Sequence, residues 1–136
     1  MIRALMAEYK KTKTDLIVLK SEKSAFLVQQ TNEKNGNFIV NYLADNDSIV
    51  IREVYLNSSI SEIHYDVNRD DKIDCIEYFD ANATYPKIRK LDTNGDELFD
   101  IQEDDKNHDG IIDTSELQIN IDGMLIPFST FSMIIM

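Results

Sequence analysis

The strongest constraint on this chain is a recurring spacing of oxygen-bearing side chains between residues 66 and 116. In the window 105–116, carboxylate or amide side chains stand at positions 1, 3, 5, 9 and 12, and Gly110 stands at position 6. The windows 66–77 and 92–103 fill the same five positions, with Asp71 and Glu97 at position 6. Only Asp104 separates the second window from the third. Like charges at this density repel one another, so we expect the segment to fold around cations.

The spacing suits Ca²⁺, which takes six to eight oxygen ligands. A loop that turns sharply at position 6 brings those five side chains and the backbone carbonyl of position 7 to one point. We therefore expect up to three calcium ions, one in each window. The predicted ligands are Asp66, Asn68, Asp70, Lys72, Asp74 and Glu77 in the first window, Asp92, Asn94, Asp96, Leu98, Asp100 and Glu103 in the second, and Asp105, Asn107, Asp109, Ile111, Asp113 and Glu116 in the third.

The three windows are not equivalent at position 6. Glycine adopts the required positive φ at no steric cost, whereas another residue there costs roughly 1 kcal/mol. The window 105–116, with Gly110, therefore ranks first. A solvated acidic turn is the alternative interpretation for any single window, and three windows with the same ligand positions argue against it.

The window 105–116 resembles an EF-hand loop, and the other two windows resemble degenerate ones. Asp104 alone leaves no room for the helices that flank such loops, and the 13-residue offset between Asp92 and Asp105 is similar to thrombospondin type 3 repeats and the aspartate-rich repeats of bacterial surface proteins. That resemblance implies a chain wrapped around a row of ions with little regular structure, and an extracellular or cell-surface location. Because only Asp104 separates Glu103 from Asp105, we also expect the loops at 92 and 105 to lie end to end and to bind calcium cooperatively.

The charge distribution limits the possible partners. The net charge is −11, and residues 66–116 hold 16 acidic and 6 basic side chains, whereas residues 1–65 hold 8 of each. Phosphate or nucleic acid is therefore excluded as a partner of the acidic segment. We expect no membrane span, because every apolar stretch is shorter than about 20 residues. Residues 1–13 lack the apolar segment of a secretory signal, so we expect either an intracellular protein or a piece of a longer chain.

The remaining sequence predicts a mainly β fold of antiparallel strands and hairpins with little helix. Strands are expected at Asp15–Leu19, Ala25–Gln30, Asn37–Leu43 and Ser48–Tyr55, with a short helix within residues 1–13. We divide the chain into a β-rich part (1–65), the acidic loops (66–116) and apolar C-terminal strands (117–136), all within one domain. The predicted core residues are Phe26, Val28, Phe38, Val40, Val50 and Ile51.

These observations favour a calcium-binding structural or interaction module whose ions make an acidic segment rigid. Its partners would be calcium and another protein, or the rest of a larger chain. Two alternatives stay open: a calcium sensor that exposes a binding surface, and an accessory domain of a secreted enzyme. We expect no catalysis by the chain itself, because His64 and His108 have no nucleophile arranged beside them in the sequence.

Overall fold

The computed structural model describes residues 2–131. These residues form one long helix, nine strands and three short 3₁₀ helices. In chain order they are α1 (Ile2–Ser21), η1 (Lys23–Ala25), β1 (Leu27–Gln30), β2 (Phe38–Leu43), β3 (Ile49–Leu56), β4 (Ser59–Tyr65), β5 (Cys75–Tyr78), β6 (Ile88–Leu91), β7 (Ile101–Asp104), η2 (Thr114–Glu116), β8 (Leu117–Ile121), β9 (Met124–Pro127) and η3 (Phe128–Phe131). The strands make one antiparallel sheet in which each strand pairs with the next along the chain. The prediction of a mainly β, antiparallel fold is confirmed.

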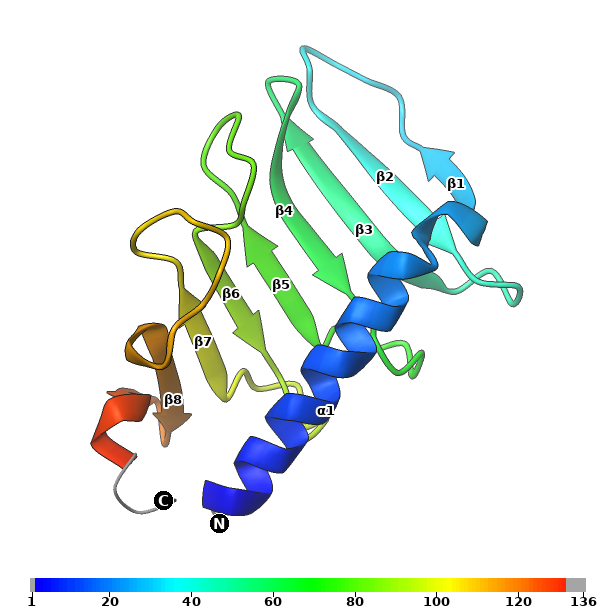
Figure 1. The fold of residues 1–136 in the computed structure, drawn as a ribbon. Helices are drawn as coiled ribbons and strands as arrows, with labels where there is room; N and C mark the ends of the chain where they lie inside the picture. Colours follow the sequence, from blue (N-terminus) through cyan, green and yellow to red (C-terminus); the bar gives the residue numbers. More distant parts are fainter. Residues whose placement is uncertain (1, 132–136) are drawn as a thin grey trace.

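Helix α1 crosses one face of the sheet (Figure 1). It is longer than the helix predicted within residues 1–13, and the predicted strand at Asp15–Leu19 is wrong, because that segment is helical. Leu16 and Leu19 continue the helical spacing of the apolar residues before them, so one uninterrupted face can cover the sheet. Both side chains are 2% exposed, whereas Ile17 and Val18 face solvent. The β-branched pair is typical of a strand, but packing of the neighbouring leucines decides the conformation.

The side chains that face α1 follow from the strand register. Successive residues of a strand point to opposite faces, so partners in register share a face across the whole sheet. One such set, which we call the apolar row, runs from β2 to β8 and consists of Tyr42, Ile51, Tyr65, Cys75, Leu91, Ile101 and Ile119. Leu16 and Leu19 join this row in the hydrophobic core. We call the helix-covered side the inner face.

The predicted strands Ala25–Gln30, Asn37–Leu43 and Ser48–Tyr55 correspond to β1, β2 and β3. Among the predicted core residues, Val40, Val50 and Ile51 are buried, and Phe26 and Phe38 are partly buried. Val28 is 58% exposed because it lies on the edge strand β1. The apolar C-terminal strands appear as β8 and β9, and residues 132–136 of that prediction lie outside the described part of the chain.

The antiparallel order places the acidic loops at two different ends of the sheet. Loops 66–74 and 92–100 follow β4 and β6, which run in the same direction, so both loops lie at one end. Loop 105–116 follows β7 and lies at the other end (Figure 1). The expectation that loops 92 and 105 lie end to end is therefore wrong. Strand β7 separates them, because Ile101 and Glu103 pair with β6 and β8.

Candidate metal centre

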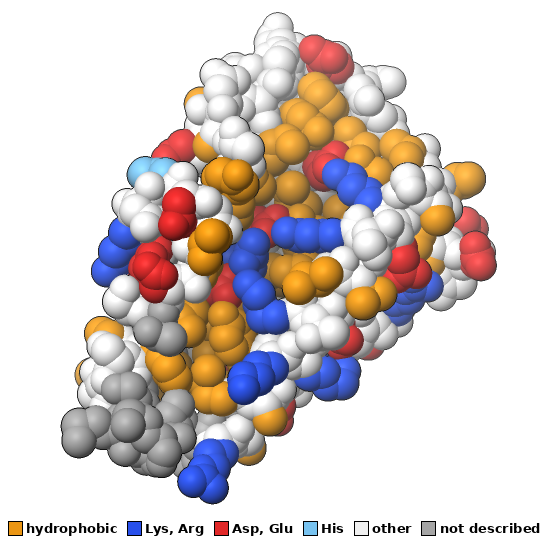
Figure 2. Space-filling model, in the orientation of Figure 1, with side chains coloured by type: hydrophobic (Ala, Val, Ile, Leu, Met, Phe, Trp, Pro, Cys, Tyr) orange, Lys and Arg blue, Asp and Glu red, His pale blue; other side chains and the backbone are white. Residues whose placement is uncertain are grey.

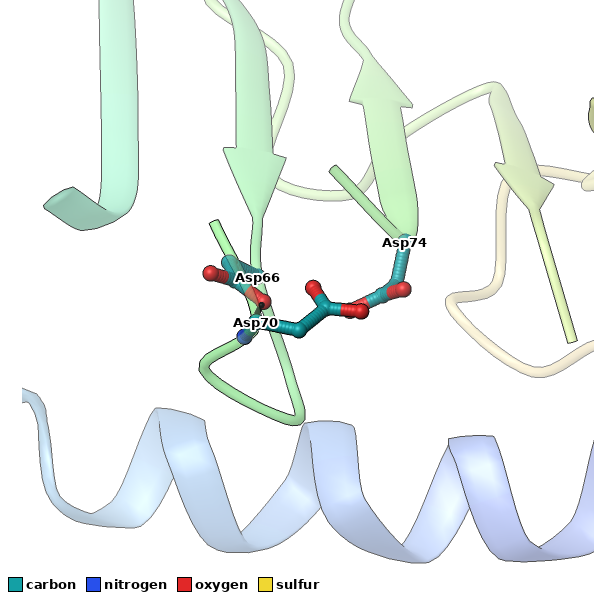
Figure 3. Close-up of side chains that lie close together, drawn as sticks. All are labelled: Asp66, Asp70 and Asp74. Atoms are coloured by element: carbon teal, nitrogen blue, oxygen red, sulfur yellow. Dashed lines mark hydrogen bonds between the residues drawn. The ribbon is translucent and has the colours of Figure 1, made fainter. Parts of the chain in front are cut away.

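The first acidic loop brings three carboxylates together. Asp66 directly follows β4, Asp74 directly precedes β5, and Asp70 lies between them in the loop, with its carboxylate directed into the space between the other two (Figure 3). Each side chain offers an oxygen, and these oxygens all lie within 4.8 Å of one another. Asp66 and Asp74 are buried, whereas Asp70 is exposed. We call this group the aspartate triad. Among the residues that the structure describes, it is the one acidic group that is this compact.

The loop backbone is wrapped around these carboxylates. The Asp66 carboxylate accepts the N–H groups of Asp70, at 3.2 Å, and of Asp71, at 2.8 Å. Asp74 accepts the Val67 N–H at 2.9 Å. Asp71, at position 6, has φ of 68°. The turn that glycine makes at low cost is therefore made here by aspartate, a residue that tolerates the left-handed region better than most.

The triad is electrostatically strained while it carries three negative charges. Burial raises the pKa of Asp74 to about 7, and the neighbouring Asp70 and Asp66 add to the rise. Burial also raises the pKa of Asp66, against the opposing effect of the two backbone N–H groups that it accepts. A buried carboxylate beside like charges is stabilised by a proton or by a cation. The triad can therefore hold a metal ion through hard oxygen ligands.

The loop 92–100 has a similar backbone path. Asp92 accepts the N–H groups of Gly95, at 3.0 Å, and of Glu97, at 2.7 Å. Asp100 accepts both the N–H and the hydroxyl of Thr93. Glu97 at position 6 has φ of 68°. Of the other predicted side-chain ligands, Asn94 and Asp96 accept backbone N–H groups within this loop. The two loops at this end are directly linked, since the Asp92 N–H donates to the Asp74 carbonyl at 2.7 Å.

The third loop, which the sequence ranks first, also folds around its first aspartate. Asp105 is buried and accepts the Gly110 N–H at 2.9 Å. Glu116 is buried and accepts the Lys106 N–H at 2.8 Å. Asn107, Asp109 and Asp113 are exposed. The described structure thus places its most compact carboxylate group in the first loop, although that loop lacks the glycine.

Two predicted ligands have their carboxylates elsewhere. Glu77 and Glu103 lie on β5 and β7, where strand alternation turns them to the inner face. The Arg89 guanidinium bridges them, with Nη2 2.5 Å from Glu77 Oε2 and Nη1 2.5 Å from Glu103 Oε1. Lys20 and Lys13 of α1 add ion pairs to Glu77, at 2.9 Å, and to Glu103, at 2.8 Å. We call these five residues the ion-pair cluster.

Charge pairing outweighs desolvation in this cluster. Burial alone would raise the pKa of Glu77, but Arg89, Lys20 and the hydroxyl of Tyr65 hold it below its ordinary value. Burial likewise opposes the charge of Arg89, and the two glutamates keep its pKa above the ordinary value. Sequence reasoning did not identify this cluster. Its signal is an apolar and a charged residue two positions apart in 75–77, 89–91 and 101–103, because residues i and i+2 of a strand share a face and one charge per strand then lies on the buried face.

At position 7 the predicted ligand is the backbone carbonyl, and the side chains of Leu98 and Ile111 are 70% and 68% exposed. The carbonyl roles of Lys72, Leu98 and Ile111 stay predictions, as does the identity of any ion.

Comparisons with known proteins give no match to a family model, to a curated protein or to a solved structure. Within residues 2–131, no helix combines the length and apolar character that crossing a membrane requires. The fold and the aspartate triad therefore have to be interpreted from their own chemistry.

Proposed function

We propose that this protein is a calcium-binding structural module and that the aspartate triad is its principal site. The observation that carries the proposal is the close approach of three carboxylate oxygens in the loop between β4 and β5. Two of these aspartates are buried at the ends of strands, so the site is positioned by the sheet. Calcium accepts six to eight oxygens in flexible geometry, which suits a loop that adds backbone carbonyls and water to three carboxylates.

The proposed role of the ion is to hold the loop end of the sheet. Bound only to the folded state, calcium adds to the free energy of unfolding by mass action. It also compensates the burial of negative charge and the repulsion from Asp70 and Asp66, which together raise the pKa of Asp74. The space of about 250 Å³ between loops 66–74 and 92–100 and helix α1 includes Asp74, Asp92 and Thr12 in its lining. Fixing the first loop therefore supports the packing of α1 as well as the β4–β5 connection.

Glu77, the glutamate at position 12 of the first loop, is engaged in the ion-pair cluster, so this loop lacks the bidentate ligand that strengthens an EF-hand. We expect an affinity in the range of extracellular modules, about 10⁻⁴–10⁻³ M. Magnesium should compete poorly, because it requires near-ideal octahedral geometry and retains its waters.

Calorimetric titration with calcium tests the proposal through two neighbouring substitutions. Asp70→Asn removes one charge from the triad at an exposed position, and we expect the calcium affinity to fall at least tenfold. Asp71→Asn removes the same charge from the next residue, whose side chain is outside the triad, and should change the affinity less than threefold. Asparagine tolerates positive φ, so the control keeps the turn. Equal losses in the two variants, or no binding by the wild-type protein at millimolar calcium, would contradict the proposal.

A further inference from the structure

A cavity with a strongly acidic lining lies between helix α1 and the loops 66–74 and 92–100. Its volume is about 250 Å³, and we call it the helix–loop cavity. Figure 3 shows loop 66–74 extending toward the helix. The lining holds four carboxylates and one ammonium group, and four minus one leaves three negative charges in excess. These charged residues are Glu8, Lys11, Asp15, Asp74 and Asp92.

Two of these carboxylates are buried without a cation beside them. Asp74 and Asp92 are each 2% exposed. Neither forms an ion pair with a Lys or Arg side chain of the described residues. Backbone N–H groups of their own loops donate to both, but these groups carry no net charge. Buried charges in proteins are paired or coordinate metals, so this pair of aspartates points to a cation as the ligand.

The chain's own cations are engaged elsewhere. Lys11 is the one cation of the lining, and its side chain is 76% exposed and pairs with Asp15. Lys13 and Lys20 of α1 pair with the glutamates of the ion-pair cluster. Figure 2 shows Lys and Arg side chains gathered in the hollow of the inner face, which is the side of the cluster.

Thr12 gives an independent indication of a ligand. It lies between Tyr9 and Leu16 in the stripe of α1 that faces the sheet, and it is 7% exposed. Thr14 on the same helix donates its hydroxyl to the Lys10 carbonyl at 3.0 Å, whereas the Thr12 hydroxyl has no hydrogen-bond partner among the described residues. The one described polar side-chain atom that is both sealed and unpartnered is Asn120 Oδ1. The Thr12 hydroxyl is therefore not sealed, and the cavity that Thr12 lines is the space it faces.

The geometry favours an ion that keeps its water. Among the described residues, the aspartate triad is the one group of three carboxylates whose oxygens lie within 4.8 Å of one another, so the carboxylates of the cavity do not converge on a bare ion. A water molecule takes about 30 Å³, which leaves room in the cavity for an ion with several waters. Magnesium gives up its waters reluctantly and is usually held through one or two carboxylates.

We propose that the helix–loop cavity binds a hydrated magnesium ion. The waters of the ion donate hydrogen bonds to the carboxylates of Asp74 and Asp92 and to the hydroxyl oxygen of Thr12. The ion supplies the positive charge that the two buried aspartates call for, and it ties α1 to both loops. Asp74 also belongs to the aspartate triad, but the proposal does not require calcium there, because Thr12, Asp15 and Asp92 are outside the triad.

A titration of the full chain with hexaamminecobalt(III), followed by ¹H–¹⁵N NMR of the backbone amides, tests this inference. This complex resembles hydrated magnesium in size and in its outward hydrogen-bond donors, and it does not exchange its ligands. We expect saturable shifts at residues 8–15, 67–68 and 92–95, and we expect excess magnesium chloride to reverse them. Sodium chloride of the same ionic strength should not. Shifts without saturation, or equal displacement by the two salts, would overturn the proposal.

Substitutions at two threonines locate the ion. Thr12→Val nearly keeps the shape of the side chain and removes the hydroxyl, so binding of the cobalt complex should weaken about fivefold. Because position 12 faces the sheet, valine should keep or raise the melting temperature, which separates a loss of binding from a loss of folding. Thr12→Ser should restore most of the affinity. Thr14→Val is the control, because Thr14 is outside the lining. Unchanged binding in Thr12→Val would overturn the proposal.

Substitutions at two aspartates separate this site from the calcium site. Asp15→Asn and Asp70→Asn each remove one negative charge, but Asp15 lines the cavity and Asp70 does not. Asp15→Asn should weaken the cobalt complex more than about threefold and leave calcium binding within that range, and Asp70→Asn should do the reverse. Equal losses of cobalt binding in the two variants would show that net charge alone attracts the complex, and would overturn the proposal.

Discussion

At the residue scale, both the backbone conformation of Gly110 and its close approach to Tyr85 disfavour any other residue at this position. Its φ of 80° is in the left-handed region, and a Cβ atom there would lie 2.7 Å from Cδ1 of the Tyr85 ring. Gly95 has a similar φ of 78°, but a Cβ atom there would have nothing within 4 Å. A comparison of alanine substitutions at the two glycines therefore separates the cost of backbone strain from the cost of a clash with Tyr85.

We predict that Gly110→Ala destabilises the protein more than Gly95→Ala does. Gly95→Ala should cost about 1 kcal/mol, the strain of a non-glycine residue at positive φ. Gly110→Ala should cost about 1 kcal/mol more, because Tyr85 must move away from the loop. Urea unfolding measures both values. In a Tyr85→Ala background the extra cost should disappear, and a cost for Gly110→Ala that is unchanged in that background would contradict the assignment to this contact.

The spacing of the acidic residues predicted the first loop correctly but misplaced the glutamate at its twelfth position. The spacing of Asp66, Asp70 and Asp74 indicated a cation loop, and these residues do form a compact group. Glu77 occupies the twelfth position of the same pattern, but β5 begins at Cys75, and the alternation of the strand carries Glu77 to the inner face. The loop pattern and the strand pattern compete for this residue, and hydrogen bonding to β4 and β6 decides the outcome.

At the element scale, the ion-pair cluster joins β5, β6 and β7 to α1 through buried charges. Arg89 has a side chain that is 14% exposed, between two glutamates that are at most 2% exposed. Removing the guanidinium leaves two buried carboxylates with less compensation, and that is more costly than the absence of the whole network.

We predict that Arg89→Met lowers the free energy of unfolding by about 3–5 kcal/mol. Lys87→Met is the control, because Lys87 pairs with Asp80 at the surface, and such exposed pairs contribute about 0–1 kcal/mol. The pH dependence gives a second measurement. The pKa of Glu77 and Glu103 is lowered in the folded state, so their contribution is present above the unfolded value of about 4.3 and is lost as the pH falls below it.

In Arg89→Met this contribution should be lost, so the acid side of the stability curve should flatten or reverse. Chemical unfolding at several pH values between 3 and 7 measures it. A variant that keeps the wild-type stability and the wild-type pH profile would show that the cluster contributes little.

The element scale also explains which elements the sequence predicts well and which it predicts poorly. The strands β1, β2 and β3 were recognisable from their β-branched and aromatic residues, and their turns were marked by Asn35-Gly36 and Asp45-Asn46-Asp47. The full length of α1 was not, because Ile17 and Val18 interrupt the polar face of the helix with residues typical of strands. Only the sheet beneath Leu16 and Leu19 gives the helix a reason to continue.

At the scale of the whole molecule, strand direction decides which loops can act together. Loops 66–74 and 92–100 share one end of the sheet, and loop 105–116 lies at the other. The spacing of residues along the chain cannot reveal this arrangement, because the four residues of β7 are enough to take the chain from one end of the sheet to the opposite end. Any coupling between ions should therefore link the first two loops, through the Asp92 N–H and the Asp74 carbonyl.

The central claim is that calcium binds at the aspartate triad, and a calcium titration followed by ¹H–¹⁵N NMR of the backbone amides tests it most directly. We predict that the amides of residues 66–74 shift first and saturate, that those of 92–100 respond next, and that Asp70→Asn suppresses the response at 66–74. The amides at 105–116 should shift independently of that substitution. The account would be contradicted if residues 66–74 showed no shift at millimolar calcium, or if every shift were confined to residues 105–116.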